Sequence, residues 1–536
     1  MKSNPFITKD GEKTEITSEG YTYLDSILTD TKGQVYAFNH TVSPIMVAAA
    51  MARLSRRSSD LRITFLDEFA EVGESDASGL IKRVVTEFGD DSVQQLIGVH
   101  VVVEGASNLL TKLLEWGRYM AYLEQSTRYI FFDQKDANGK YLYFSPNLEP
   151  ALLKEYNQTM DQVFDLYSNM VRRLTTYVRE KHPEPSDAAE RRAWLGATRA
   201  QACDAIRPVL PVSTKSTVGI YGSSQAVESL IIHLLSEPLE ESQEIGRQIL
   251  REVRKVIPAF LERTDLPERG GATTAYRATT RSKTRELADK YLSQENAHKT
   301  RDEVTLLDYW PKNELDLTSE ILFEHSNLSI VDIEKQVSAW SKSQKEEIFE
   351  TYIGERFNRR HKPGRAFEKA HFEWEIDGKD YGTFRDLQRH RVVDAFEWQR
   401  LTPYYGYEVP ALVIEAGLEK EFAQCFELSS ILYEKMWKAG YEIEAQYATL
   451  LGHRMRYRFI LNARGLFHFL ELRTAPQGHP GYRKICNEMY ELLAKVYPLT
   501  AKAMKFVNQN EDPGLTRLAA ERATQFKLAQ LEEKKK

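Results

Sequence analysis

The sequence predicts an α+β protein made of two or three folding units. Short runs of aromatic and β-branched residues, such as Gly98–Val103, are typical of strands, and longer stretches place apolar residues on one face of a helix. At 536 residues the chain exceeds what one hydrophobic core usually supports. Hydrophobic residues make up 42% and charged residues 28%, which is typical of a globular chain.

Landmarks of the first half recur in the second half, and this recurrence indicates an internal duplication. Each half has an aromatic, strand-like segment, then a proline that opens a long helical pattern, and later an amphipathic run that closes before a proline. The paired segments are residues 141–144 and 404–407, residues 150–152 and 410–412, and residues 256–258 and 496–498. Chance recurrence in a large helical chain is the alternative.

These landmarks set the predicted domain boundaries. We expect a first domain over residues 1–265 and a second over residues 316–510. Between them, residues 266–315 form a polar, partly helical connecting segment. Residues 511–536 form a tail, and its charged end, Glu532–Lys536, is predicted to be frayed and solvated.

Charge and cysteine content narrow the function classes. A net charge of -6 argues against a general nucleic-acid-binding surface, although a local cationic pocket for a phosphorylated small molecule remains possible. Cys203, Cys425 and Cys486 show no metal or redox spacing, so we expect no metal site and a reducing compartment. No signal-like or membrane-spanning apolar stretch is present, and we expect a cytoplasmic protein with no membrane partner.

The segment Glu124-Gln125-Ser126-Thr127-Arg128-Tyr129 is a candidate anion site. It follows a helical pattern that ends near Tyr122, and on a turn its hydroxyls, carboxylate and guanidinium suit a phosphate and a sugar hydroxyl. Local helix capping by the hydroxyls is an equal alternative. Farther along, Arg207 lies where prolines break a helix, and there it can bind an anion or satisfy terminal carbonyls.

Two cationic clusters occur in the second half. Arg389-His390-Arg391 can bind a pyrophosphate or stabilise an anionic cofactor ring, whereas the alternative is a solvated helix face paired with nearby aspartates. Asn462-Ala463-Arg464 is followed on the same helical stripe by His468 and Arg473. Arginines on this apolar helix need partners or a polar cavity, because an unpaired buried charge is costly. This favours a functional role for the second cluster.

Taken in order, these motifs resemble the flavin-dependent thymidylate synthases. That family has an Arg-His-Arg triplet and a Ser-x-Arg-Tyr ending, followed by Arg-x-x-Leu-Pro, Asn-x-Arg and a further arginine. The first half keeps the Ser-x-Arg-Tyr ending and Arg207, but its triplet position reads Trp116-Gly117-Arg118. The second half keeps the triplet, Glu397 and the Asn462 helix, but Gln446 stands where the first half has Arg207. Each half therefore keeps the motif that the other half has lost.

The resemblance implies two tandem synthase-like domains, each an antiparallel sheet with long helices, that form a pseudo-dimer. It also implies conversion of dUMP to dTMP with methylenetetrahydrofolate, NADPH and FAD, at composite sites in a homodimer that mimics the family tetramer. By this resemblance the dUMP-binding residues are Glu124, Gln125, Ser126, Thr127, Arg128 and Arg207. The FAD-binding residues are Arg389, His390, Arg391, Glu397, Asn462, Arg464 and His468, and Arg473 activates the pyrimidine. A non-catalytic flavin- or nucleotide-binding relative is the alternative, and RNA binding through the arginine runs is disfavoured by the acidic balance.

Overall fold

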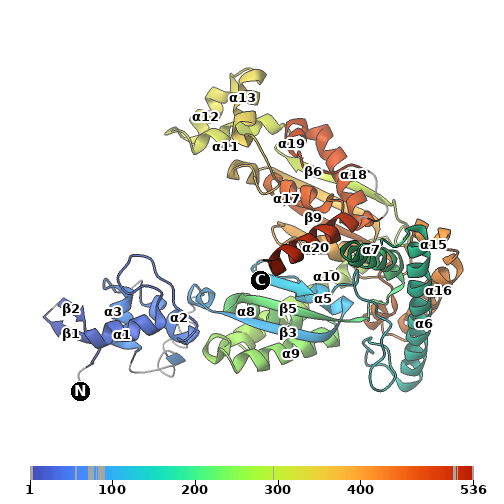
Figure 1. The fold of residues 1–536 in the computed structure, drawn as a ribbon, viewed down its shortest axis with the longest axis horizontal. Coiled ribbons are helices and arrows are strands. Elements are labelled where there is room, and N and C mark those ends of the chain that lie inside the picture. The colour runs from blue at the N-terminus through green and yellow to red at the C-terminus, as the bar shows by residue number, and fades with distance from the viewer. Residues whose placement is uncertain are drawn as a thin grey trace. The chain divides into compact units, whose positions relative to one another are not determined.

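The chain packs as two compact units, which the computed structural model describes over residues 4–11, 13–54, 57–70, 78–79, 81, 91–293, 295–510, 515 and 517–533 (Figure 1). Unit 1 comprises Met1–Glu104, Leu113–Glu124 and Thr217–Leu292. Unit 2 comprises Gly105–Lys112, Gln125–Ser216 and Ser293–Lys536. Helices and small antiparallel sheets make up both units, and the α+β class predicted from the sequence is confirmed.

Unit 1 carries a small amino-terminal hairpin and a three-stranded sheet of order β3-β5-β4. Its elements are β1 (Ile7–Asp10), β2 (Lys13–Ile16), α1 (Ser18–Ile27), α2 (Pro44–Ala52), α3 (Leu61–Glu68), η2 (Val93–Leu96), β4 (Met120–Glu124), α8 (Ser224–Ser236), α9 (Glu240–Arg254), η4 (Pro258–Phe260), η5 (Glu262–Asp265) and α10 (Gly270–Tyr291). Along the chain, β3 (Gly98–Ser107), α5 (Asn108–Leu114) and β5 (Lys215–Ser223) span the boundaries of the two units.

Unit 2 is built on a four-stranded antiparallel sheet of order β6-β7-β9-β8. Its strands are β6 (Glu303–Trp310), β7 (His371–Asp380), β8 (Ala395–Trp398) and β9 (Arg454–Asn462). Its helices are α6 (Pro150–Lys181), α7 (Ala188–Ile206), η3 (Arg207–Val209), η6 (Glu314–Leu317), α11 (Thr318–Phe323), α12 (Ile330–Ser338), α13 (Lys342–Ile353), η7 (Arg365–Glu368), α14 (Tyr381–Gln388), α15 (Ala411–Glu415), α16 (Glu419–Lys438), η8 (Glu444–Ala448), α17 (Ala463–Arg473), α18 (Pro480–Val496), α19 (Pro498–Ala503) and α20 (Leu518–Glu533).

The longest helix, α6, shows how the sequence pattern directs packing. Pro150 occupies its first turn, where the missing amide hydrogen is not needed. Its buried residues, among them Tyr156, Met160 and Val163, recur at spacings of three or four and form one apolar face. Helix α16 packs against α6, and Figure 1 shows the two lying side by side.

The two halves repeat one another in their strand–helix junctions. The sheet order β3-β5-β4 of the first half matches β7-β9-β8 of the second. At each junction a polar side chain accepts a hydrogen bond from a backbone amide three residues on, as an N-cap does. The accepting and donating residues are Ser107 and Leu110, Ser223 and Ala226, Asp380 and Thr383, and Asn462 and Gly465. These matching junctions agree with a duplicated chain.

Equivalent segments of the two repeats pair with each other inside unit 2. Residues 208–212 follow Arg207, and residues 449–452 follow Gln446, which occupies the corresponding position in the second repeat. Their backbones form an antiparallel bridge between Pro211 and Leu450. The hydrogen bonds run from Val212 N to Thr449 O (2.9 Å), Leu451 N to Leu210 O (2.8 Å) and Gly452 N to Pro208 O (2.7 Å). We call this pairing the seam; it joins the repeats as a two-fold interface joins identical subunits.

Some local predictions are wrong. The pattern before Glu124 is not helical, because residues 120–124 form β4, which pairs with β5. Residues 404–407 are not a strand, since Tyr404 packs its ring on Tyr433 of α16 instead of joining a ladder. Residues 141–144 make only isolated bridges.

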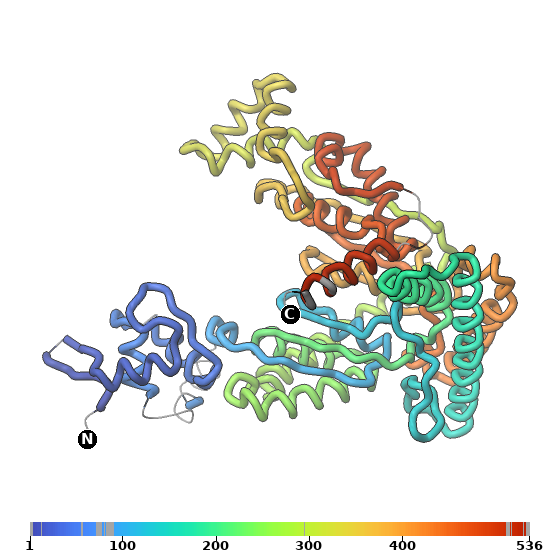
Figure 2. The backbone as a smooth tube through the Cα atoms, viewed as in Figure 1, coloured from blue at the N-terminus to red at the C-terminus, as the bar shows by residue number. Residues whose placement is uncertain are grey.

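The carboxy-terminal tail contains a helix. Within residues 511–536, α20 forms a helix that packs against α7, and Figure 2 traces it beside that helix. The last three residues of the predicted solvated end, 534–536, lie outside the described residues. The compact units also follow different limits from the predicted domains, and the break at residues 292/293 falls inside the predicted connecting segment. The repeat boundaries themselves stay a prediction.

A buried ion pair fixes helix α17 within unit 2. The Arg356 guanidinium donates to both Glu471 carboxylate oxygens at 2.7 Å and to the Ala503 carbonyl at 2.8 Å. Both side chains are buried, so each charge depends on the other. Among the described residues, no helix combines the length and apolar character needed to cross a membrane.

Replacing Glu471 with Leu should lower the free energy of unfolding by about 3–5 kcal/mol, because Arg356 would remain buried and unpaired. The double variant Arg356→Leu/Glu471→Leu should recover most of that loss. Urea denaturation of the two single variants and the double variant measures the coupling. Additive losses would show that the two side chains do not act as a pair.

Buried histidines should make the fold sensitive to acid. Burial lowers the pKa of His453 to about 3, and burial with Arg281 and Arg277 lowers that of His233 to about 3. In the unfolded chain the pKa of these side chains is about 6.5. Above that pH these histidines do not lower the free energy of unfolding. Below it, the free energy of unfolding falls by about 1.4 kcal/mol per pH unit for each histidine. Denaturation of the wild type and His453→Gln at pH 7 and pH 5 should give a smaller loss in the variant.

Candidate functional site

A cavity of about 240 Å³ within unit 2 gathers guanidinium groups from both repeats. We call it the arginine cavity. Its lining residues are Ser126, Thr127, Arg128, Tyr129, Arg207, Gly382, Arg385, Asp386, Arg389, Arg473, Tyr482 and Arg517. Six of these are arginines and one is an aspartate, so the lining carries a large excess of positive charge. Such a lining suits a small, multiply charged anion such as a phosphate.

Arg128 is held rigidly at the cavity wall. Its Nε and Nη2 atoms donate to the two carboxylate oxygens of Asp204 on α7, at 2.6 and 2.5 Å. Its Nη1 atom lies 3.4 Å from the Tyr482 hydroxyl. Although burial favours the neutral form, the ion pair with Asp204 raises the pKa of Arg128. The bidentate contact fixes the guanidinium plane, and Nη1 is the nitrogen near Tyr482, which also lines the cavity.

Arg207 and Asp386 join the two repeats across the cavity. The Arg207 Nη2 atom lies 3.1 Å from Asp386 Oδ2, and both residues are buried. Although burial opposes ionisation, Arg207 and Arg389 hold the pKa of Asp386 well below its usual range. Asp386 is therefore a carboxylate at neutral pH, and it orients Arg207 from the second repeat.

Arg473 lies at the end of α17 and is oriented by a histidine of the triplet. Its Nε atom donates to His390 Nε2 at 2.7 Å. Burial, and then the charge of Arg473, holds the pKa of His390 well below its ordinary value. His390 is therefore neutral, with Nε2 as the acceptor. The guanidinium also faces the Tyr482 ring at 5.3 Å, and Arg128 faces the same ring at 5.9 Å.

A second cationic region adjoins His390. The centroid of the His390 ring lies 5.6 Å from that of the His468 ring. Burial lowers the pKa of His468, as do the charges of Lys362 and Arg359. Burial and Arg464 likewise lower the pKa of Lys362. The contributions of these cations to the lowered pKa values indicate a positive potential on this side of α17.

Other predicted site residues lie away from the cavity lining. Glu124 ends β4 in unit 1, and Gln125 is exposed. Glu397 on β8 pairs with Arg458 at 3.0 Å on the surface. Three more predicted residues are also absent from the lining: Arg391 is exposed, Asn462 caps α17, and Arg464 contacts Glu368 and the Pro363 carbonyl. Their assigned roles stay predictions.

Several residues in the cavity lining or in contact with it had no place in the predicted site. Asp204, Tyr482 and Arg517 belong to no motif, and Arg385 lies one turn before the triplet. The signal that could have found Asp204 is its place on the helix that ends at Arg207. Arg517 lies in the predicted tail, residues 511–536, outside both predicted domains and their motifs.

The corresponding positions of the other repeat have structural uses. Gln446 stands where the first repeat has Arg207, and its Oε1 atom accepts from the Leu401 amide at 3.2 Å while its Nε2 atom donates to the Ile443 carbonyl. In unit 1, Trp116 occupies the triplet position and stacks on His233, with ring centroids 4.2 Å apart. Neither Gln446 nor Trp116 can therefore offer a guanidinium to an anion.

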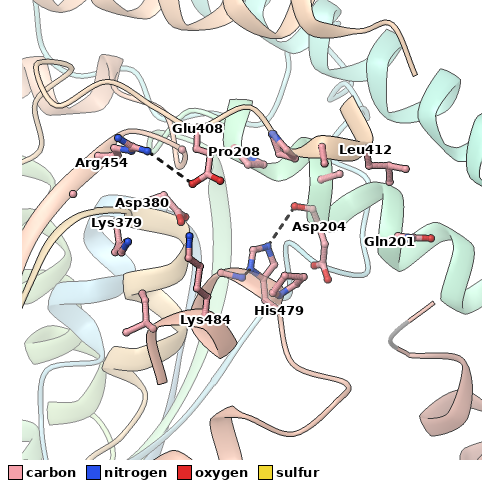
Figure 3. A pocket seen from close by; sticks show the side chains of 18 residues that line it. Gln201, Asp204, Pro208, Lys379, Asp380, Glu408, Leu412, Arg454, His479 and Lys484 are labelled. Carbon is pink, nitrogen blue, oxygen red and sulfur yellow. Dashed lines mark hydrogen bonds and ion pairs between the residues drawn. The ribbon is translucent and has the colours of Figure 1, made fainter. Parts of the chain in front are cut away.

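A larger cavity of about 400 Å³ within unit 2 has Asp204 among its lining residues (Figure 3). His479, Arg454, Glu408 and Lys484 line it together with apolar side chains. The His479 Nε2 atom lies 3.5 Å from the Asp204 carbonyl oxygen, and burial, then Arg207, lowers the pKa of His479 to about 4. Unlike the arginine cavity, this lining mixes both signs of charge. In the described part of the chain, no cluster of histidine, cysteine or acidic side chains is grouped as a metal site would be.

Fold and site define a duplicated α+β protein with an arginine-lined cavity to which both repeats contribute. The family described as thymidylate synthase complementing protein matches residues 38–259 and 305–499. The chain belongs to this family, which confirms the resemblance predicted from the sequence. The two matched segments correspond to the two repeats.

Similar proteins span nearly the whole chain. A UPF0159 protein of Chlamydia muridarum is 30% identical and one of Chlamydia pneumoniae is 31% identical; in both cases the match covers 94% of this chain and 97% of the relative. Among solved structures, a UMP/dUMP methylase PolB from Streptomyces cacaoi bound with 5-Br dUMP is 18% identical, covering 38% of this chain and 93% of that chain, with a TM-score of 0.30.

Inorganic phosphate should stabilise the protein by binding in the arginine cavity. At about 100 times its dissociation constant it should add about 2.7 kcal/mol to the free energy of unfolding. Arg389→Gln should weaken this binding about tenfold, since it removes one cationic donor of the lining. The matched control is Arg172→Gln, an exposed arginine of unit 2 outside the cavity. Thermal shifts in phosphate, compared with sodium chloride of equal ionic strength, measure the effect; equal shifts in both variants would contradict an anion site here.

Proposed function

We propose that this chain is a flavin-dependent thymidylate synthase, which converts dUMP to dTMP with methylenetetrahydrofolate as methylene donor and NADPH-reduced FAD as hydride source. The observation that carries the proposal is the arginine cavity, in which Arg128 and Arg207 of the first repeat meet Arg473 of the second. These are the residues that the family resemblance assigns to the nucleotide. Membership of the thymidylate synthase complementing protein family supports the same reaction class.

The phosphate of dUMP would lie against the arginine wall. Ser126 and Thr127 line the cavity beside Arg128 and can donate hydroxyl hydrogen bonds to a phosphate or a sugar oxygen. The Arg128 and Arg207 side chains are already oriented by Asp204 and Asp386. Little rotamer freedom would then be lost on binding.

Arg473 would act on the pyrimidine ring. Its hydrogen bond to neutral His390 fixes the direction of the guanidinium. A fixed positive charge beside the uracil favours ionisation of a ring nitrogen, which makes the pyrimidine carbon more nucleophilic. The positive charge itself is not lost to a carboxylate, because the partner is an uncharged imidazole.

The donor chemistry beside Arg473 fits an anionic, phosphate-bearing cofactor. Lys362, Arg359 and Arg473 give the surroundings of His390 and His468 a positive potential, and a pyrophosphate there would relieve the cation repulsion that, after burial, lowers the pKa of both histidines. We therefore expect His390 and His468 to hold FAD. Arg389 and Arg391, both exposed near the end of α14, would add further contacts.

The cysteines are consistent with a route that forms no covalent cysteine adduct. All three are buried. Burial raises the pKa of Cys203 and of Cys425 to about 12, and it also raises that of Cys486. At neutral pH these groups are protonated thiols, and a thiol is a much weaker nucleophile than a thiolate. The pyrimidine would instead be activated electrostatically.

Substitution of one arginine from each repeat tests the proposal. Arg128→Lys and Arg473→Gln should each lower dTMP formation by at least about 100-fold, since one loses the bidentate fork and the other the charge at the pyrimidine. Arg172→Lys, outside the cavity, is the matched control. The assay is dTMP formation from dUMP, methylenetetrahydrofolate and NADPH. Full turnover in either cavity variant would contradict the site, and dUMP binding without any turnover in the wild type would favour a non-catalytic relative.

Mixing the two inactive variants distinguishes a site within one chain from a site between chains. Because Arg128 and Arg473 line the same cavity in one chain, each mixed assembly would still contain only damaged cavities. We therefore expect no recovery after the Arg128→Lys and Arg473→Gln chains are unfolded and refolded together. Recovery of about a quarter of wild-type turnover would indicate that the two residues act across a subunit interface.

A further inference from the structure

Arg517 lies in the arginine cavity although it falls outside both segments matched by the family. Its guanidinium stacks over the Tyr129 ring, 4.0 Å from the centroid. Tyr129 closes the turn that carries Ser126, Thr127 and Arg128. The carboxy-terminal segment therefore adds a side chain to the same wall that the first repeat supplies.

Helix α20 secures this position. It packs against α7, the helix that carries Asp204. Arg522 of α20 donates to the Glu190 carboxylate of α7, with an Nε to Oε2 distance of 2.8 Å. Glu521 lies against Gly196, where an added Cβ would meet its carboxylate carbon at 3.4 Å. Arg517 is one residue before the helix, so these contacts hold its backbone beside the cavity.

No direct ion pair holds the Arg517 guanidinium among the described residues, although the charge of Glu521, four residues on, partly offsets its burial. Its residue exposure is 8%, and its buried Nε atom has no hydrogen-bond acceptor. Burial, and then the charge of Arg128, lowers the pKa of Arg517 to about 9. Arg128 and Arg207, by contrast, each have a carboxylate. A buried guanidinium with donors to spare and another cation nearby favours an anion beside it.

We propose that Arg517 binds the phosphate group of the ligand in the arginine cavity and thereby favours a nucleotide monophosphate over its nucleoside. This inference rests on the proposed function, because it assumes that a nucleotide occupies the cavity. The carboxy-terminal segment is then part of the binding site and not only a packing element. Arg517 acts through charge and hydrogen bonds on the phosphate, whereas the sugar and base would contact other residues.

Calorimetric titration of the full-length protein with dUMP, deoxyuridine and inorganic phosphate tests this role. In Arg517→Gln the affinity for dUMP and for phosphate should fall about 10- to 100-fold, the usual effect of removing a charged hydrogen-bond donor. Affinity for deoxyuridine should be unchanged, since it has no phosphate. Arg517→Lys should fall in between, because it keeps the charge without the planar fork.

Two further variants separate binding from packing. Lys527→Gln removes one positive charge from an exposed position of the same helix and should leave all affinities unchanged. Arg522→Gln loosens α20 from α7 and should weaken dUMP binding less than Arg517→Gln does. Thermal unfolding of each variant without ligand reports any loss of packing.

The outcomes are distinct. Wild-type affinity for dUMP and phosphate in Arg517→Gln would overturn the inference while leaving the nucleotide site in place. An equal loss for dUMP and deoxyuridine would also overturn it, since it would indicate a structural role. A wild-type chain that binds phosphate but not dUMP would overturn the proposed function, and the phosphate titration would still decide whether Arg517 binds the anion.

Discussion

The arginine cavity depends on the antiparallel seam between residues 208–212 and 449–452. The seam begins next to Arg207, so it brings the end of α7 against the helices of the second repeat. Tyr381 of α14 adds to this contact by donating its hydroxyl to the Asn108 carbonyl of α5 at 2.9 Å. Backbone pairing has a fixed register, which helps to place Arg207 against Asp386 of α14.

The electrostatic state of the cavity follows from how few carboxylates face so many guanidinium groups. Asp204 and Asp386 each orient one arginine, and the neutral His390 orients Arg473. A neutral partner orients a guanidinium without offsetting its positive charge, whereas a carboxylate partner offsets part of that charge. The cavity therefore combines geometric order with an unbalanced positive charge, which is the arrangement expected of a preorganised anion site.

Much of the fold could be predicted because its helices have clear ends in the sequence. Pro150 opens α6, and the prolines at 258 and 498 follow α9 and α18. The strand β4 was mistaken for the end of a helix because residues 120–124 are too few to show a period of two. Residues 404–407 have strand-forming side chains, but the contact of Tyr404 with α16 overrides that propensity.

The candidate site could be predicted only where a motif marked it. Arg128, Arg207, Arg389 and Arg473 belong to recognisable patterns, and all four line the cavity. Tyr482 and Arg517 reach it through tertiary packing of α18 and α20, and a local sequence pattern holds no information about that packing. Conversely, Glu397 and Arg464 sit in recognisable patterns yet find other partners on the surface of unit 2.

Fusion of the two repeats frees the seam from a constraint that identical subunits obey. In a symmetric dimer both sides of the interface have the same sequence, so a substitution changes both sides at once. Here the two sides are inherited as separate positions of one chain. Arg207 can remain an arginine while the equivalent position is Gln446, whose side chain accepts a hydrogen bond from the Leu401 amide. Evolution can thus trade one of two equivalent sites for rigidity without dismantling the other.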